Sequence, residues 1–342
     1  MRRPLSASGT VHGVNIGKRA RPRRFRNTEP SITVANAYTL PSAAIAGRTR
    51  GRPRRAVPLA AAPVPARPGE LAVTWYGHAS TLIEIEGHRI LADPMWGHRA
   101  SPSALVGPAR LHPVPVGLES LPPVDAVVIS HDHYDHLDKP TIRSLLHTQD
   151  APFLVPTGVG AHLRGWGVPV ERIVELDWGK STSVGELTVT CTEARHFSGR
   201  GLIRNTTLWA SWVINGRRRR AYFGGDTGYG AFFADIADRH GPFELTVLPI
   251  GAYDAHWPNI HMTPEQAVTA HTELCGGDAS RGVLVPMHWA TFNLALHPWD
   301  EPIRRLVAAA AEAGTTVAVP RPGERVELPN PGPVEQWWAD IS

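Results

Sequence analysis

The six-residue run His131-Asp-His-Tyr-Asp-His136 constrains the fold of this chain more than any other sequence feature. It directly follows Val127-Val-Ile-Ser130, a largely apolar run of the kind that forms a strand buried on both faces. His131 and His133 are two residues apart, so on an extended backbone their imidazoles point to the same side and can hold one metal ion. The aspartate and histidine that end the run follow as the chain turns, and they can reach a second ion. The run therefore predicts a two-metal site at the end of a buried strand.

Further ligands are expected at later strand ends, because one motif cannot complete two coordination spheres. His196, Asp226 and His288 each stand just after an apolar run, at positions where α/β folds gather functional groups. We predict that His131, His133 and His196 hold the first ion, that Asp135, His136 and His288 hold the second, and that the carboxylate of Asp226 bridges the two. Glycines near that carboxylate, Gly224, Gly225 and Gly228, are predicted to let the backbone approach the metals where a β-carbon would interfere.

The ligand types indicate the metal and the reaction. The chain has two cysteines, Cys191 and Cys275, far apart and without CxxC spacing, so a disulfide framework or a cysteine-built metal site is not expected. Histidine and carboxylate ligands suit two zinc ions best, and the same set accepts iron or manganese. Two ions about 3.5 to 4 Å apart lower the pKa of a water between them and produce a hydroxide nucleophile. No Gly-x-Ser-x-Gly motif occurs, so hydrolysis by this hydroxide is favoured over a covalent acyl-enzyme route.

Short apolar runs alternate with helical stretches from residue 71 onward, which predicts a layered α/β domain. The predicted strands span residues 71–76, 81–85, 89–92, 126–129, 153–155, 187–192, 209–214, 220–223, 245–250 and 283–286. The predicted helices span residues 140–146, 264–273 and 302–313. Asp138 is the expected N-cap of the first of these helices, with Pro140 in its first turn.

Residues 1–70 differ from the rest of the chain in composition and charge. They contain 13 Arg and 1 Lys against 2 acidic residues, a net charge of +12. The whole chain carries +4, so residues 71–342 carry −8. We therefore predict a basic segment over 1–70 that is disordered or lies loosely on the domain, and one hydrolase domain over 71–342. The basic segment could contact anionic membrane, whereas the acidic domain argues against nucleic acid as a partner.

Linked motifs over residues 70–315 resemble the metallo-β-lactamase superfamily and, within it, the N-acyl-phosphatidylethanolamine-hydrolysing phospholipase D family. Besides the metal motif, they include Trp75-Tyr-Gly-His-Ala-Ser80, Asp93-Pro-Met95, Glu175-Leu-Asp-Trp178, Phe223-Gly-Gly-Asp-Thr-Gly-Tyr229, Pro249-Ile-Gly-Ala-Tyr253, His261-Met-Thr-Pro-Glu-Gln-Ala-Val268 and Met287-His-Trp-Ala-Thr-Phe292. A weaker resemblance to the same family lies at Arg24-Phe-Arg-Asn27. The superfamily resemblance implies an αββα sandwich with two metals at one edge.

The family resemblance also implies an activity, in which a metal-bridging hydroxide attacks phosphorus and cleaves phosphatidate from an N-acylethanolamine. In that family the histidine before the Pro-Glu-x-Ala helix reaches the substrate, and this position is His261. The predicted catalytic residues are thus Asp226, His261 and Asp135. Aromatic side chains near the ligands could line a pocket for acyl chains, so the predicted substrate-binding residues are His261, Tyr253, Trp257 and Phe197. His78 and Asp93 are expected to support metal ligands from outside.

Several alternatives remain open from the residues alone. A lactonase or other acyl hydrolase would use the same hydroxide on a carbonyl carbon. A nuclease is favoured only by the basic segment, and a non-catalytic metal-binding sensor does not need seven ligands. No stretch reaches the roughly 18 apolar residues of a membrane span, and no signal peptide is evident. We expect a cytoplasmic enzyme, at most peripheral to the inner face of the membrane, whose partners are a phospholipid or another phosphodiester and, in a homodimer, a second copy of the chain.

Overall fold

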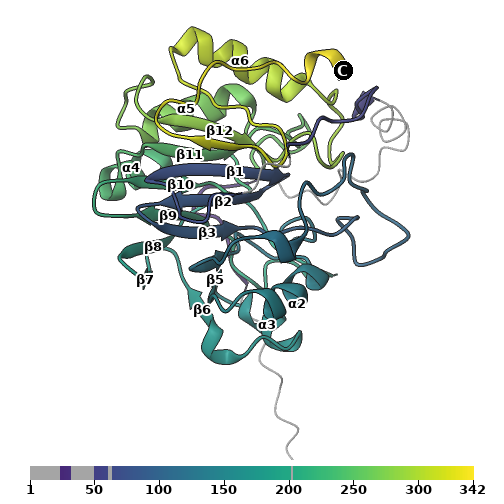
Figure 1. Ribbon diagram of the computed structural model, residues 1–342, viewed down its shortest axis with the longest axis vertical. Helices are drawn as coiled ribbons and strands as arrows, with labels where there is room; N and C mark the ends of the chain where they lie inside the picture. Colours follow the sequence, from purple (N-terminus) through teal and green to yellow (C-terminus); the bar gives the residue numbers. More distant parts are fainter. Residues whose placement is uncertain (1–23, 32–49, 61–63, 202) are drawn as a thin grey trace, which may run out of the picture.

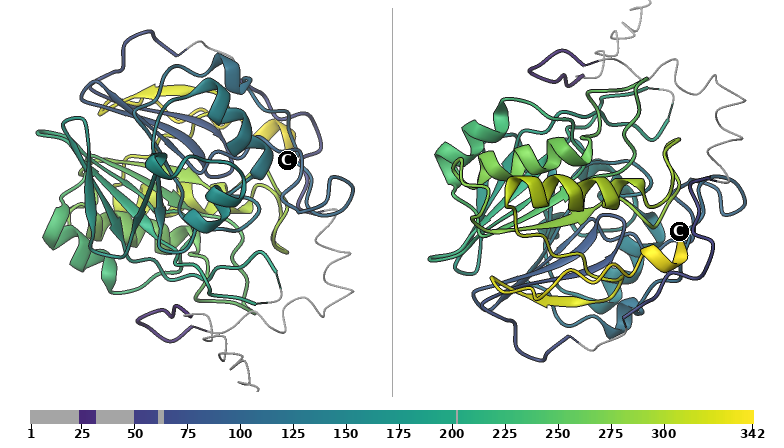
Figure 2. Two further views of the ribbon diagram at one scale, coloured as in Figure 1. Left: turned by 90° about the horizontal axis from the view of Figure 1, so that it is seen from below. Right: turned by 90° about the horizontal axis from the view of Figure 1, so that it is seen from above.

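Two β-sheets stack face to face, and helices cover the outer side of each sheet (Figure 1, Figure 2). The computed structural model describes residues 24–31, 50–60, 64–201 and 203–342. The layers follow the order helix, sheet, sheet, helix, which is the αββα sandwich that the sequence predicts.

The first sheet has seven strands in the order β13-β1-β2-β3-β4-β5-β6. Its strands are β1 (Leu71–Gly77), β2 (Ser80–Ile85), β3 (His88–Ala92), β4 (Ala126–Val128), β5 (Phe153–Pro156), β6 (Ile173–Leu176) and β13 (Arg325–Glu327). The second sheet has six strands in the order β12-β11-β10-β9-β8-β7. Its strands are β7 (Ser181–Val184), β8 (Leu187–Thr192), β9 (Ser211–Asn215), β10 (Arg220–Phe223), β11 (Leu245–Pro249) and β12 (Val283–Met287).

In the part of the chain that the structure describes, five α-helices form the two outer layers, and Figure 1 shows α2 and α3 beside the first sheet and α4, α5 and α6 beside the second. They are α2 (Lys139–Thr148), α3 (Gly160–Gly165), α4 (Phe232–His240), α5 (Pro264–Leu274) and α6 (Glu301–Ala313). Asp138 caps α2 as predicted, because its side chain accepts a hydrogen bond from the backbone N–H of Thr141, and a proline occupies the first turn. None of the described helices is long and apolar enough to span a bilayer.

The hydrophobic core has three parts that match the layers. The central part lies between the sheets and includes Val128 and Val247, whereas Val127 packs outward with Ile142 of α2. A third part joins the second sheet to α4, α5 and α6. Neighbouring residues of one strand thus face two different apolar layers, which explains why the strands have continuous apolar sequences rather than alternating ones.

The predicted strands and helices are all present, with boundaries that shift by one or two residues at most ends. The prediction missed β6, β7, β13, α3 and α4. β6 and β7 are edge strands with partly exposed residues, and Ser181-Thr-Ser-Val184 offers little apolar signal. Short or half-exposed elements lack the hydrophobic periodicity from which elements are recognised.

The first strand, β1, starts at Leu71, where the composition of the sequence changes. The described parts of residues 1–70 differ from the expected loose segment because their backbones bond to the domain. Arg54 donates its N–H to the Ile341 carbonyl (2.7 Å), and Ala60 donates to the Pro322 carbonyl (2.9 Å). Residues 1–23, 32–49 and 61–63 lie outside the described residues, so the prediction for them stays a prediction.

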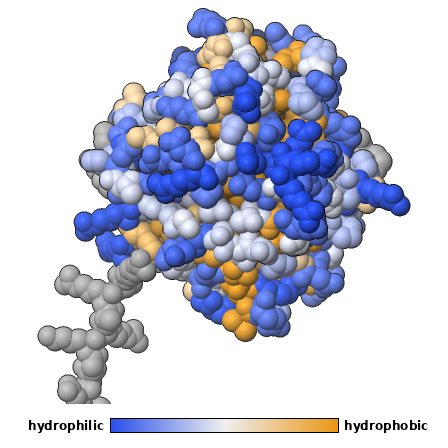
Figure 3. Space-filling view, turned by 90° about the vertical axis from the view of Figure 1, so that its left-hand side faces the viewer, coloured by the Kyte–Doolittle hydropathy of each residue, from blue (hydrophilic) through white to orange (hydrophobic). Residues whose placement is uncertain are grey.

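An arginine run, Arg217–Arg220, spans the turn between β9 and β10 and the first residue of β10, and acidic residues lie against it. Glu86 accepts backbone N–H groups of Arg217, Arg218 and Arg219, and Arg218 pairs with Glu70 at 2.9 Å. The face of the molecule in Figure 3 is mostly hydrophilic, with small, separate apolar areas. The matched charges argue against this run as a free nucleic-acid site.

Candidate metal centre

The seven predicted ligands meet at one edge of the sandwich, where β4, β8, β10 and β12 end. The motif histidines begin three residues after β4, and His288 follows β12 immediately. Asp226 comes three residues after β10, and His196 comes four residues after β8. Residues distant in sequence therefore converge because their strands end at the same edge, which is the arrangement that the sequence predicts.

The first cluster contains His131, His133, His196 and Asp226, whose ligand atoms all lie within 4.8 Å of one another. The Nδ1 atom of His133 is 2.8 Å from His131 Nε2 and 3.3 Å from His196 Nε2. The Oδ2 atom of Asp226 is 3.8 Å from His131 Nε2 and 3.6 Å from His196 Nε2. These four side chains could hold one ion, with the carboxylate on one side of it.

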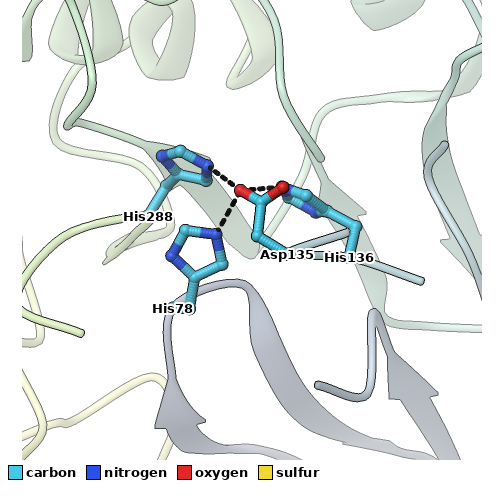
Figure 4. Close-up of side chains that lie close together, drawn as sticks. All are labelled: His78, Asp135, His136 and His288. Carbon is cyan, nitrogen blue, oxygen red and sulfur yellow. Dashed lines mark hydrogen bonds and ion pairs between the residues drawn. The ribbon is translucent and has the colours of Figure 1, made fainter. Parts of the chain in front are cut away.

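The second cluster contains Asp135, His136, His288 and one additional histidine, His78 (Figure 4). The Oδ2 atom of Asp135 lies 2.8 Å from His78 Nε2, 3.3 Å from His288 Nε2 and 3.4 Å from His136 Nε2. His78 was expected to support a ligand from outside, and its hydrogen bond to Asp135 agrees with that role. Its Nε2 atom is also close enough to count among the donors of this cluster.

Asp226 lies between the two clusters, as a bridging ligand should. One of its oxygens, Oδ2, faces the first cluster and is also 3.1 Å from His136 Nε2. The other oxygen, Oδ1, is 3.1 Å from His288 Nε2. A single carboxylate thus contacts ligand atoms of both groups.

The donor atoms themselves test whether metal ions fit. His136 Nε2, His288 Nε2 and Asp226 Oδ1 are buried, and although His288 Nε2 lies 3.1 Å from Asp226 Oδ1, none of the three atoms takes part in a hydrogen bond. Buried polar atoms are rarely left without a partner, and these converge on one another with their lone pairs. Such atoms are those that cations would satisfy, so the residues present fit two bound metal ions.

The outward-facing nitrogens of the ligand rings are held by neighbouring groups. His136 Nδ1 lies 2.7 Å from Asp93 Oδ2, His131 Nδ1 lies 2.9 Å from Ser130 Oγ, and His196 Nδ1 lies 3.1 Å from the Ile260 carbonyl. A proton on each outer nitrogen leaves the inner nitrogen free to bind metal. Asp93 therefore has the role predicted for it. The sequence does not reveal Ser130 or Ile260 in this role, because backbone and hydroxyl acceptors have no motif.

We expect Asp93→Asn to weaken metal binding by about 10- to 100-fold, because the variant loses the charged acceptor that orients His136. Asp93 has a φ of 40°, a conformation that asparagine tolerates, so the backbone should keep its course. Competition with a chromophoric chelator would measure the affinity. Asp150→Asn, an exposed substitution, is the control. Unchanged affinity in Asp93→Asn would contradict the assigned role.

Charge in the centre is arranged around Asp226. Burial alone would raise the pKa of this carboxyl, but the nearby imidazoles of His136, His288 and His261 outweigh it and hold the pKa well below its ordinary value. Burial lowers the pKa of His261 to about 3, against the opposing attraction of Asp226. The centre therefore combines an ionised carboxylate with a neutral His261 near pH 7.

Two of the predicted substrate residues, His261 and Phe197, lie beside the candidate metal ligands and are partly exposed. One ligand atom each of His261, Asp226 and His288 lies within 4.8 Å of the other two. The Nδ1 atom of His261 has no hydrogen-bond partner. The ring of Phe197 lies 4.5 Å from that of His133, and both rings are partly exposed. Both His261 and Phe197 are thus partly open to solvent beside the candidate ligands.

The other two predicted substrate residues are engaged elsewhere. The Tyr253 hydroxyl donates to Glu301 of α6 (2.8 Å), and its ring stacks on His297, so the side chain belongs to the packing of α6. Trp257 donates its indole N–H to the Ala252 carbonyl (2.8 Å) and stays partly exposed in the loop before His261. Aromatic composition alone could not distinguish pocket residues from packing residues.

The glycines near Asp226 serve chain packing rather than approach to the metals, which corrects the prediction. A β-carbon on Gly225 would lie 2.5 Å from the β-carbon of Ser130, and one on Gly228 would clash with the carbonyl of Asn259. A β-carbon on Gly224 would lie 3.2 Å from atoms of strand β11. Because these glycines have no side chains, neighbouring loops can pack closely against them, and this packing positions Asp226.

Several residues at the centre have strained backbone conformations with positive φ. Among the described non-glycine residues, seven have positive φ, and they include His78 (54°), Asp93 (40°) and His288 (62°). Such conformations are costly and persist where the surroundings enforce them, often at functional sites. They aim these side chains into the centre from strand ends.

Comparisons with known proteins agree with this geometry. The family model described as a beta-lactamase superfamily domain matches residues 88–289. An uncharacterized protein of Mycobacterium tuberculosis is 58% identical over 295 residues, which cover 86% of this chain and 79% of the relative. N-acyl-phosphatidylethanolamine-hydrolyzing phospholipase D 1 of Caenorhabditis elegans is 37% identical over 236 residues, covering 66% of this chain and 65% of the relative. An isothiocyanate hydrolase from Delia radicum gut bacteria shares the fold, with a TM-score of 0.59 at 20% identity, over 75% of this chain and 98% of the neighbour.

Proposed function

This chain belongs to the metallo-β-lactamase superfamily as a metal-dependent hydrolase, and we propose that it is a two-zinc phosphodiesterase of the N-acyl-phosphatidylethanolamine phospholipase D type. The resemblance noted from the sequence motifs is confirmed at the level of the superfamily. The phosphodiesterase assignment, the two zinc ions and the phospholipid substrate are proposals.

The observation that carries the proposal is the position of His261 beside both Asp226 and His288. A neutral imidazole with an unpartnered nitrogen can donate a hydrogen bond to a phosphoryl oxygen. The 37% identity to N-acyl-phosphatidylethanolamine-hydrolyzing phospholipase D 1 of Caenorhabditis elegans adds support.

The exposure of the ligands indicates where a substrate would enter. His131, His136, His196, Asp226 and His288 are buried, whereas His133, Asp135 and His261 are partly exposed. A phosphodiester arriving on this side would meet His261 at one edge and the ring of Phe197 at another. Two bound divalent ions would supply Lewis acidity and a hydroxide nucleophile at neutral pH. Asp135 and Asp226 would act as metal ligands. The apolar ring of Phe197 would exclude water beside the reacting phosphate group.

The proposal is tested by metal analysis of the purified protein together with turnover of three substrates. These are bis(p-nitrophenyl) phosphate, an acyl lactone and N-acyl-phosphatidylethanolamine in mixed micelles. We expect about two zinc ions per chain, hydrolysis of both phosphodiesters and little hydrolysis of the lactone. Lactone hydrolysis without phosphodiester hydrolysis would overturn the phosphodiesterase assignment, and a protein without stoichiometric metal would overturn the metal centre. Membrane contact through the basic N-terminal residues stays a prediction.

A further inference from the structure

The short described segment Arg24–Ser31, which we call the N-terminal strap, lies against the metal centre although it is distant from it in sequence. Figure 2 shows it in purple at the edge of the domain. Within the strap, Asn27 pairs with the backbone of His196. Its Oδ1 atom accepts from the His196 N–H (3.1 Å), and its Nδ2 atom donates to the His196 carbonyl (2.9 Å). The amide thus contacts both backbone groups of one predicted metal ligand.

The amide of Asn27 makes all the hydrogen bonds that its chemistry allows. Its Oδ1 atom also accepts from the indole N–H of Trp209 (2.9 Å), and its Nδ2 atom also donates to Ser31 Oγ (3.0 Å). Two acceptor sites and two donor sites are therefore used. A fully used side-chain amide has one orientation, so it can hold His196 in one place.

His196 needs such a partner because of its place in the chain. β8 ends at Thr192 and β9 begins at Ser211, and the described residues between them, 193–201 and 203–210, form no helix or named strand. The backbone of the neighbouring residue, Arg195, forms an isolated β-bridge to Gly228 and belongs to no named strand. Loops of this length are usually less rigid than strand ends, and here one carries a ligand. Asn27 gives the His196 backbone the two hydrogen bonds that a neighbouring strand would supply.

The strap also ties the His196 loop to the loop that follows Asp226. Glu29 pairs with Arg195 (3.2 Å) and accepts from the backbone N–H of Ala231 (2.9 Å). Arg195 in turn donates to the carbonyl of Tyr229 (2.9 Å). The strap therefore joins the loops of two first-cluster ligands to each other.

We infer that Asn27 is a positioning residue for the first metal ion, acting through His196. The imidazole of His196 is held by the Ile260 carbonyl and its backbone by Asn27, so its Nε2 atom stays directed at His133 and Asp226. The basic N-terminal region thus contributes part of the metal centre. This inference depends on the metal centre and not on the phosphodiesterase proposal.

The experiment compares zinc binding by the full-length chain and its Asn27→Ala variant, using a chromophoric chelator as competitor. We expect one of the two ions to bind about 10- to 100-fold more weakly in the variant, with the other unchanged. The absorption spectrum of the cobalt-substituted protein should change for the same ion. Arg26→Ala, at an exposed neighbouring position of the strap, should bind both ions as the unaltered chain does.

A second variant separates positioning from folding. Asn27→Asp keeps an oxygen that can accept from the His196 N–H but loses the donor to its carbonyl, so its zinc affinity should fall between those of the unaltered chain and Asn27→Ala. If Asn27→Ala does not fold, Asn27→Asp is judged by the same comparison of the two ions. Equal weakening of both ions, or unchanged binding of both, would overturn the inference. Because no substrate is used, failure of the phosphodiesterase proposal would leave this result intact.

Discussion

Replacing Asp226 with asparagine should lower kcat/KM by about 10³-fold or more, because loss of a shared ligand should exceed the roughly 10- to 100-fold cost of losing an outer partner. The carboxylate contacts donor atoms of both clusters through its two oxygens. Asparagine replaces one oxygen with an NH₂ group, which has no lone pair for a metal, and removes the negative charge among the histidines. Metal content after dialysis should fall below two ions per chain.

Elemental analysis and phosphodiesterase kinetics would measure these two effects on the same preparation. Asp235→Asn is a suitable control because Asp235 is exposed on α4, with a side chain 67% exposed, and forms only a surface pair with Arg239. Its kinetics and metal content should match those of the unaltered chain. Retention of both ions and of full activity in Asp226→Asn would exclude a bridging role for this carboxylate.

Replacing His261 with alanine should lower kcat by about 10²- to 10³-fold while both metal ions are retained, because one hydrogen bond to the reacting phosphoryl group is lost. His261 lies beside the clusters with an unpartnered nitrogen, in a position to contact a phosphoryl oxygen. Single-turnover kinetics on bis(p-nitrophenyl) phosphate, with metal analysis of the same sample, would measure both quantities. His147→Gln, an exposed substitution on α2, is the control.

The metal content of His261→Ala decides between two roles. Loss of one ion along with activity would identify His261 as a ligand, since its ligand atom lies within 4.8 Å of those of Asp226 and His288. Full activity with both ions present would remove His261 from the catalytic residues. Only retained metal with reduced kcat agrees with a hydrogen bond from His261 to the phosphate group.

Much of the fold was predictable because the strands that form it are strongly apolar. Val127 and Val128 face different apolar layers, so their strand appears as a continuous apolar run. β6 and β7 lie at sheet edges and are partly exposed, and their stability depends on neighbouring strands rather than on their own residues. Such elements could not be recognised locally.

The residues around the ligands were harder to predict than the ligands. Asn27 is 169 positions from His196, and no local pattern links an asparagine to a histidine at that separation. Tyr253 belongs to an aromatic-rich stretch, but its hydroxyl bonds to Glu301, 48 positions away. The glycines beside Asp226 are visible in the sequence. Their role in close packing depends on Ser130 and on other loops that lie against them, and these neighbours come from distant parts of the chain.

The candidate ligand set and the layered architecture follow from local patterns in the sequence: histidines and aspartates placed just after apolar strands, and apolar runs of strand and helix length. Three features became visible in the folded chain alone: which ring nitrogens face the candidate metal centre, the approach of His78 to Asp135, and the contact of Asn27 with His196. The physical reason is that the direction of a side chain depends on its backbone angles and on partners brought from distant parts of the chain, and these exist only after the sheets have stacked.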